Sequence, residues 1–311
     1  MDIIAACKIR DISKVIDPTV LAFAPLLKRA KKSILEVPKK TFQYGQTERH
    51  QLDVYYPLTS ITTETPVLVY VYGGGFNTGE KVISPKSFGL VYTNVAAFFA
   101  RRGYVVVIPD YRLTPDTQYP GSAEDVRDAV RWVLENPSSL SPTDVLPDIE
   151  HLAMLGHSAG AAHIATMLFD PAVIAQDDPL RGRISAALLE SPPFDLSEMT
   201  LGWDSGPTHA QYWRSLELAK EHDPLHLYRR LSPVAVEKLP PLLMIEAEFE
   251  PEWLIRAGDA FQDEVAEKTG KRLTRLIARG HNHISLNWAL STGEGEEWAE
   301  DVVAWLESNR S

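Results

Sequence analysis

The apolar residues of this chain gather in short continuous runs that recur from residue 66 onward. A run that is apolar at every position suits a strand buried on both faces, as in the centre of a parallel sheet. The runs therefore predict central strands. They cover residues 66–72, 104–109, 152–155, 185–190, 242–247 and 273–278.

Segments with helical periodicity lie between the runs. Residues 120–135 place five apolar side chains on one stripe of a helix: Ala123, Val126, Ala129, Val130 and Val133. Helices are also predicted over 87–102 and 252–267, with a closing helix near 298–306. Because strand and helix alternate, we expect an α/β fold with a mostly parallel central sheet and helices on both faces.

Four segments stand outside this alternation. Residues 41–44 and 51–57 alternate between apolar and polar positions, which predicts a hairpin of early strands. Residues 1–40 have a partly amphipathic helical pattern. Residues 192–240 are rich in proline and lack a buried strand, so we expect an insertion that lies over the sheet. We expect residues 1–311 to form a single domain.

Composition excludes several classes of protein. The one cysteine, Cys7, cannot form an internal disulfide, and the formal net charge of −11 disfavours a nucleic-acid partner. The first residues lack a signal-peptide pattern, and no apolar run is long enough to cross a membrane. We therefore expect a cytoplasmic protein that acts on a small molecule. A homodimer remains compatible with the sequence.

The strongest chemical signal is Gly156-His157-Ser158-Ala159-Gly160, which follows the apolar run 152–155 and precedes a small-residue apolar segment. This order predicts a buried strand, a very tight turn and a buried helix. A serine at the tip of such a turn is a candidate nucleophile, and glycines two residues either side avoid collisions with the strand and the helix. The helix also points its N-terminal amides toward the serine.

A serine nucleophile needs a histidine base, and two histidines compete for that role after the last predicted strand. His283 precedes an apolar residue and a helix start, which would anchor it near Ser158, whereas His281 lies closer to the strand end. We favour His283.

The acid that orients the histidine should follow the strand that ends at Ala247, where the loop offers Glu248, Glu250 and Glu252. Glu250 stands directly before a proline that would start the next helix. We favour Glu250, with Glu248 as its rival. The charge of Glu252, and in the alternative that of Glu248, would stabilise a helix N-terminus.

Backbone amides near the serine should stabilise the oxyanion that forms during acyl transfer. Gly73-Gly74-Gly75 ends a central strand, where glycine lets the backbone approach a substrate closely. We expect the amides of Gly74, Gly75 and Ala159 to form the oxyanion hole. Phosphate binding by the glycine run is disfavoured, since no Gly-Lys-Ser/Thr follows. No metal or cofactor is expected.

Together these segments resemble the α/β-hydrolase fold, and within it the hormone-sensitive-lipase-like esterases and related feruloyl-esterase-like and fungal hydrolases. The resemblance covers roughly residues 50–308. The order Ser158, Glu250, His283 is that of the α/β-hydrolase triad. The segments that carry it are Tyr72-Gly73-Gly74-Gly75-Phe76, Asp110-Tyr111-Arg112-Leu113 with Pro115, Tyr119-Pro120 with Glu124-Asp125, Gly156-His157-Ser158-Ala159-Gly160, and His283.

The chain departs from these relatives at two positions. They usually have histidine where Tyr72 stands and aspartate where Glu250 stands, so the bracing of the glycine loop and the reach of the acid must differ. Asp110 and Arg112 are expected to brace that loop.

The resemblance also implies a helical cap made of about residues 1–40 and 192–240. We expect the substrate pocket to involve five aromatic residues, although plain packing within the cap accounts equally well for the last three: Tyr72, Phe76, Trp203, Tyr212 and Trp213.

The resemblance implies a serine hydrolase that cleaves a carboxylic ester or a lactone through an acyl-enzyme. Two alternatives stay open. One is a non-hydrolytic enzyme on this fold, such as an acyltransferase, a cyclase or a lyase of natural-product biosynthesis. The other is a catalytically silent binding protein.

Overall fold

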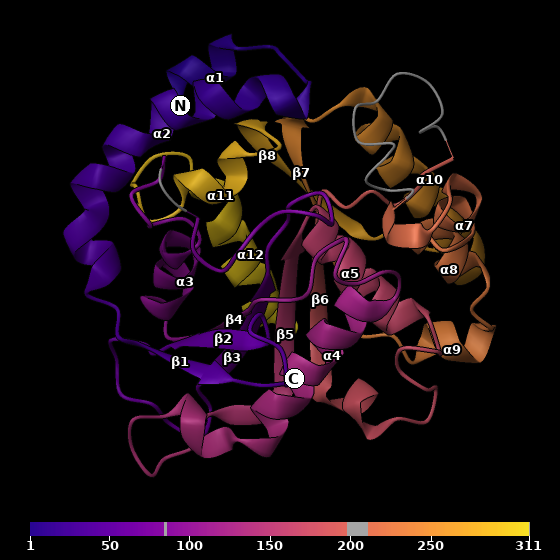
Figure 1. Cartoon of the computed structure of the whole chain (residues 1–311), viewed down its shortest axis with the longest axis horizontal. Helices are drawn as coiled ribbons and strands as arrows, with labels where there is room; N and C mark the ends of the chain where they lie inside the picture. Colours follow the sequence, from indigo (N-terminus) through magenta and orange to yellow (C-terminus); the bar gives the residue numbers. More distant parts are fainter. Residues whose placement is uncertain (84–85, 198–210, 311) are drawn as a thin grey trace.

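The computed structural model describes residues 1–83, 86–197 and 211–310. The strands of these residues form one eight-stranded sheet in the order β1-β2-β4-β3-β5-β6-β7-β8 (Figure 1). The strands are β1 (Lys39–Gln43), β2 (Gln51–Tyr55), β3 (Pro66–Val71), β4 (Val105–Pro109), β5 (Asp148–His157), β6 (Ile184–Glu190), β7 (Leu242–Phe249) and β8 (Thr274–Asn282).

The sheet is parallel from β4 to β8, and the predicted hairpin of β1 and β2 adds two antiparallel strands at one edge. All six predicted central strands are present. β3 and β4 are buried along almost their whole length because helices cover both faces of the sheet. The fold class expected from the apolar runs is confirmed.

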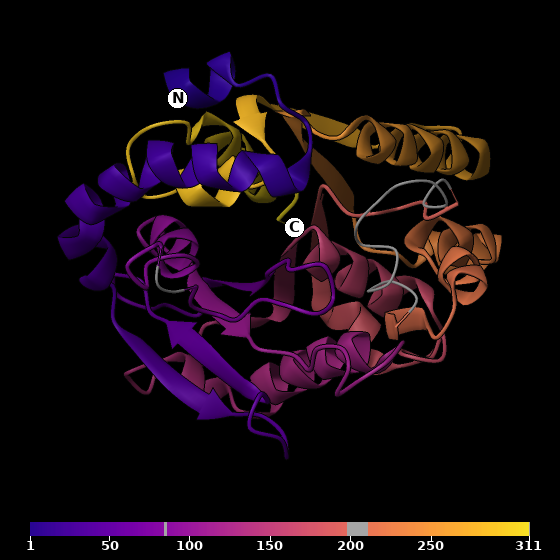
Figure 2. The same ribbon diagram turned by 45° about the horizontal axis from the view of Figure 1, so that its top comes forward.

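Helices pack on both faces of the sheet (Figures 1 and 2). On one face α5 contacts α4 and α8, and α8 contacts α10; on the other, α3 and α11 contact each other and α2, while α12 packs on β8. The bounds are α3 (Thr93–Ala100), α4 (Gly121–Glu135), α5 (Ala159–Phe169), α8 (Pro224–Arg229), α10 (Glu252–Thr269), α11 (Ser285–Ala289) and α12 (Glu297–Ser308).

The first residues form α1 (Asp2–Ala6) and the long α2 (Ile12–Leu35), which lie across the end of the sheet near β8 and α11. The described part of the 192–240 segment forms α7 (Leu216–Glu221), α8 and α9 (Pro233–Glu237) beside α10. Short 3-10 helices occupy Pro137–Leu140 and Pro179–Arg183. In the part of the chain that the structure describes, no helix combines the length and the apolar character needed to cross a bilayer.

The helix predicted over 87–102 is wrong in its first half. Phe88 and Gly89 have φ angles of 58° and 69°, in the left-handed region that interrupts a helix, and Ile83 pairs with Val91 in an antiparallel bridge. α3 therefore begins only at Thr93. The last strand also runs further than predicted, to Asn282, so that His283 follows the strand directly.

Candidate active site

Ser158 occupies the tight turn between β5, which ends at His157, and α5, which begins at Ala159. Its φ of 51° is a strained angle for serine. A β-carbon on Gly156 would lie 2.7 Å from the α-carbon of Ala161, and one on Gly160 would lie 2.1 Å from the carbonyl oxygen of Val71. Both glycines are therefore required by close backbone contacts.

His283 lies between Ser158 and Glu250. Its Nε2 is 3.0 Å from the Oγ of Ser158, and its Nδ1 is 2.7 Å from the Oε2 of Glu250. A carboxylate can only accept hydrogen bonds, so Nδ1 carries the proton and donates a hydrogen bond to Glu250. Nε2 is then an acceptor that faces the serine hydroxyl. In this arrangement His283 can take the proton of Ser158.

Glu250 is the glutamate of its loop that reaches the histidine. It follows β7 directly and is fully buried, and its Oε1 accepts a hydrogen bond of 2.6 Å from the hydroxyl of Ser191. Glu248 instead accepts from the amide of Gly280 at 2.7 Å and is partly exposed. The side chain of Glu252 is 79% exposed, on the first turn of α10.

Two further histidines lie near His283 without facing Ser158. His281 is buried with its Nδ1 3.0 Å from the hydroxyl of Ser285, and burial lowers its pKa to about 4. His157 is also buried, and burial holds its pKa well below the usual range, so the ring is neutral. Its Nε2 lies 2.9 Å from the carbonyl oxygen of His283 and donates to it, which fixes the backbone of His283.

The residues that carry the three predicted amide donors lie on the two segments next to the serine. The glycine run follows β3, and a β-carbon on Gly73 would lie 2.9 Å from the β-carbon of Ser158, so the run packs directly against the serine turn. Gly74 and Gly75 line the same cavity as Ser158, and Ala159 is the first residue of α5. Their role as an oxyanion hole stays a prediction.

The hydroxyl of Tyr72 braces the glycine run. It donates to Oδ1 of Asp110 at 2.7 Å and accepts from Arg49 at 2.9 Å, and the ring is fully buried. Asp110 also accepts from the backbone amide of Lys81 at 2.7 Å. The hydroxyl of Tyr111 donates to the carbonyl of Tyr72 at 2.7 Å. The network ties Tyr72 and Lys81, which lie before and after the glycine run, to the carboxylate of Asp110.

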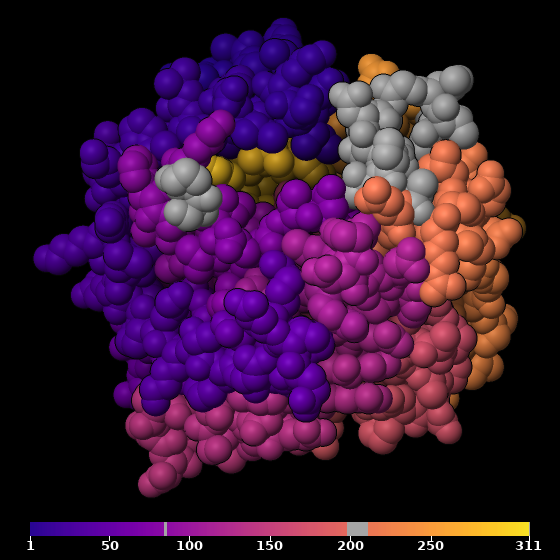
Figure 3. Space-filling model, in the orientation of Figure 1, coloured from indigo at the N-terminus to yellow at the C-terminus, as the bar shows by residue number. Residues whose placement is uncertain are grey.

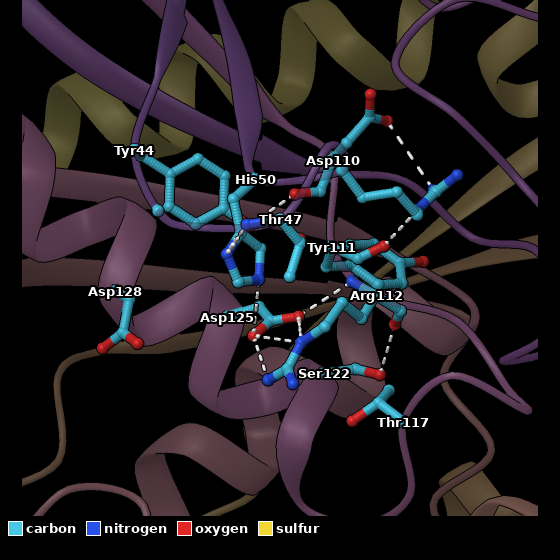
Figure 4. Close-up of polar contacts among 12 residues, drawn as sticks. Tyr44, Thr47, His50, Asp110, Tyr111, Arg112, Thr117, Ser122, Asp125 and Asp128 are labelled. Atoms are coloured by element: carbon cyan, nitrogen blue, oxygen red, sulfur yellow. Dashed lines mark hydrogen bonds and ion pairs between the residues drawn. The ribbon is translucent and has the colours of Figure 1, made fainter.

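Arg112 belongs to a second network of polar contacts, which follows Tyr111 in the sequence (Figure 4). Its guanidinium is paired side by side with the buried carboxylate of Asp125, with Nη2 2.6 Å from Oδ1, and its carbonyl accepts from Ser122 at 2.7 Å. His50 lies 3.2 Å from the same carboxylate. None of these groups lines the cavity at Ser158 within the described residues. Their positions support the structural role expected for Arg112.

Replacing Tyr72 with phenylalanine tests this bracing. The change removes one hydrogen bond from Asp110 and one from Arg49 without opening a cavity, at a cost of about 1–3 kcal/mol. We expect kcat to fall about three- to tenfold with little change in KM, because the loop amides act mainly in the transition state. Steady-state kinetics on one ester measure this. Tyr104→Phe is the control, because Tyr104 directly precedes β4, at the end of that strand away from the glycine run. Equal constants for the native protein and both variants would mean that the Tyr72 hydroxyl has no effect on catalysis.

Ser158 and His283 open into a cavity of about 720 Å³. The space-filling view shows a hollow between the indigo N-terminal helices and the purple part of the chain that follows them (Figure 3). Yellow C-terminal residues form the floor of this hollow. α2 contributes Ile12, Ile16 and Val20, which follow one another at helical spacing along one wall. The remaining apolar lining comes from Phe76, Ile83, Tyr92, Pro193, Trp253, Leu254, Ile284 and Trp288.

The five residues predicted to form the pocket lie in different places in the structure. Phe76 lines the cavity. Tyr72 is buried behind the glycine loop, while Tyr212 and Trp213 pack against Phe76 in a separate buried cluster, with ring centroids 5.0 Å and 4.7 Å from its ring. These two are packing residues in the described structure. Trp203 lies outside the described residues.

A family model, BD-FAE, matches residues 52–249, which is more than half of the chain. The chain belongs to the BD-FAE family. The match covers the glycine run and the serine turn, and it ends one residue before Glu250. The family match and the mostly parallel sheet together place the protein among the α/β-hydrolases.

Individual proteins resemble parts of this BD-FAE protein. The non-reducing polyketide synthase ausA of Aspergillus calidoustus is 33% identical over 44% of this chain and 6% of its own length. Probable carboxylesterase 13 of Arabidopsis thaliana is 30% identical over 51% of this chain and 50% of its own. The alignment thus spans half or less of these curated relatives.

A solved structure extends the likeness of fold to nearly the whole chain. Esterase B of Lactobacillus rhamnosis, inhibited by a tributyrin phosphonate, superposes with a TM-score of 0.71 over 96% of each chain, at 16% identity. At this identity the superposition supports the fold alone.

The N-terminal segment lies outside the BD-FAE match, yet it contacts both loops that carry the acid and the base, through Arg10 between α1 and α2 and through Thr19 of α2. Arg10 donates to the carbonyl of Glu250 at 2.7 Å and to that of Glu248 at 3.3 Å. Thr19 of α2 contacts the side chain of Asn282, whose Oδ1 accepts from the amides that begin α11. The sequence gives no local signal for these contacts, because the partners are more than 200 residues apart.

Arg10 is therefore expected to act as a positioning residue for Glu250. Arg10→Met should lower kcat about three- to tenfold with KM little changed, since the loss of two charge-assisted hydrogen bonds loosens the acid loop. Arg10→Lys should restore part of the rate. Lys14→Met, on the exposed side of α2, is the matched control, and an Arg10→Met enzyme whose kcat equals that of the control would contradict the role.

Proposed function

We propose that the protein is a serine hydrolase that cleaves a carboxylic ester or a lactone through an acyl-enzyme. The observation that carries the proposal is the continuous chain of contacts from the Oγ of Ser158 through His283 to the buried Glu250, at 3.0 Å and 2.7 Å, at the floor of a cavity. The BD-FAE family match and the carboxylesterase relative support the same activity class.

The proposed reaction has two halves. In the first, Ser158 attacks the ester carbonyl while His283 takes its proton, and the amides of Gly74, Gly75 and Ala159 stabilise the negative oxygen. His283 then donates the proton to the leaving alcohol, which departs from the acyl-enzyme. In the second half, water loses a proton to His283 and attacks the acyl carbon, and His283 returns the proton to Ser158. Glu250 holds the imidazole and stabilises its charged form throughout.

The strained serine turn fits this role. The positive φ of Ser158 exposes the hydroxyl at the tip of β5, and α5 directs the positive end of its dipole at the same point. A silent binding protein would have no use for the matched spacing of three side chains from three separate loops.

A substrate panel tests the proposal. The panel contains p-nitrophenyl esters of rising acyl length and a set of lactones, with products identified by mass spectrometry. We expect turnover of at least one ester to the free acid and p-nitrophenol, or of at least one lactone to its hydroxy acid. The absence of turnover with every member would contradict hydrolysis.

The same panel separates hydrolysis from acyl transfer. Transfer, cyclisation or elimination would give a product other than the free acid, and added primary alcohol would increase its yield in the transfer case. Release of the free acid at the same rate with and without the alcohol supports hydrolysis.

A further inference from the structure

The wall of the cavity is partly apolar. α2, α3 and α11 lie on the same side of the molecule, away from α10 (Figures 1 and 2). Apolar side chains from α2, from α11 and from nearby loops line this part of the cavity, which we call the apolar arm: Ile16, Val20, Ile83, Ile284 and Trp288. Such a wall suits a hydrophobic part of a substrate.

Tyr92, the residue that precedes α3, is the polar exception in this wall. It lines the cavity and is 6% exposed, and its ring packs on Tyr72 and Tyr70 with centroid distances of 5.6 Å and 5.4 Å. The two neighbouring rings hold the ring of Tyr92 in place beside the cavity.

The hydroxyl of Tyr92 makes no hydrogen bond to any residue that the structure describes, in contrast to the buried tyrosines around it. Tyr70 donates to Asn287 at 2.8 Å, Tyr72 to Asp110 at 2.7 Å and Tyr111 to the carbonyl of Tyr72 at 2.7 Å. Buried hydroxyls are normally satisfied, and an unsatisfied one lowers stability. Because Tyr92 lines the cavity, a polar group bound there can pair with its hydroxyl.

We propose that Tyr92 is a specificity-determining residue that donates a hydrogen bond to an acceptor oxygen on the hydrophobic part of the substrate. The inference rests on the proposed function and narrows its substrate class to esters or lactones that carry an ether or carbonyl oxygen within an otherwise apolar skeleton. A purely hydrocarbon group in this arm would displace water from the hydroxyl and leave it unpaired. A site with a buried donor discriminates against such a ligand.

An ether-oxygen scan tests the inference. The probes are p-nitrophenyl octanoate and its analogues in which one ether oxygen replaces a methylene, together with octyl acetate and its corresponding analogues for the alcohol side. Each ester is measured with the native protein and with Tyr92→Phe. Comparing two proteins on the same ester cancels the intrinsic reactivity of that ester.

We expect at least one oxygen position to lose about five- to tenfold more kcat/KM than the hydrocarbon parent when Tyr92 becomes phenylalanine, which is the size of one neutral hydrogen bond. Tyr104→Phe should change all esters by one common factor. A Tyr92→Phe protein that also changes every ester by one common factor would overturn the inference, whereas ester turnover itself, and with it the proposed function, would stand.

A binding measurement keeps the inference testable without turnover. Long-chain methyl ketones with the same ether-oxygen positions have no leaving group, and calorimetry measures their Kd for both proteins. A position preference that disappears in Tyr92→Phe supports the role of Tyr92 even if no ester is hydrolysed. Equal affinities for all positions in the native protein would overturn it.

Discussion

Ser158→Ala is expected to abolish nearly all ester hydrolysis while the fold survives. The change removes the attacking oxygen and the hydrogen bond to His283, and alanine fits the space that serine occupies in the turn. Loss of a triad residue typically costs roughly 10⁴-fold or more in kcat. Initial rates on the best ester of the panel measure the effect, and circular dichroism with a thermal melt checks the fold.

Ser185→Ala is the matched control for this change, because Ser185 lies on β6 and its hydroxyl donates to the carbonyl of Leu152 at 3.2 Å, away from the cavity. It should keep the native rate. A folded Ser158→Ala protein that retained more than a few per cent of the activity would rule out Ser158 as the nucleophile.

Glu250→Gln is expected to have the second largest effect, on the order of 10³- to 10⁴-fold in kcat. Glutamine keeps the size of the side chain but presents an amide, which cannot hold the Nδ1 proton of His283 in the same way or balance the imidazolium charge. The contact between Glu250 and His283 is shielded from water, since Glu250 is fully buried and His283 is 3% exposed. The imidazolium that forms during attack would therefore lose its only described carboxylate partner.

Glu248→Gln provides the internal comparison two residues away. Glu248 accepts from the backbone of Gly280 and does not contact His283, so its loss should cost less than about tenfold in kcat. If Glu248→Gln is the crippling change and Glu250→Gln is mild, the acid of the triad has been assigned to the wrong glutamate. Equal losses for both would mean that loop stability, rather than contact with His283, controls the rate.

The central sheet follows from the sequence because parallel strands buried on both faces are apolar at every position. β3 shows this well, since its residues after Pro66 are all buried. The helix predicted from residue 87 shows the limit of periodicity. The left-handed backbone of Phe88 depends on the bridge between Ile83 and Val91, and that pairing leaves no periodic trace in the sequence.

The candidate site could be predicted where its residues lie at fixed offsets from strand ends. Ser158, Glu250 and His283 each follow a parallel strand, and the ends of such strands meet at one edge of the sheet. Arg10 and Thr19 could not be predicted, because they reach the same loops from an N-terminal segment with no fixed offset to the sheet. Tyr212 and Trp213 are aromatic, as expected of a pocket wall, but in the structure they pack against Phe76 and do not line the cavity themselves.

Covalent labelling with a fluorophosphonate probe, mapped by peptide mass spectrometry, tests the central proposal most directly. The probe reacts with an activated serine in place of the ester and leaves a stable phosphonyl group. We predict a single adduct on Ser158, no adduct in Ser158→Ala, and much slower labelling of Glu250→Gln than of Glu248→Gln. No adduct on the folded native protein, or an adduct on a different serine, would contradict the proposal that Ser158 forms the acyl-enzyme.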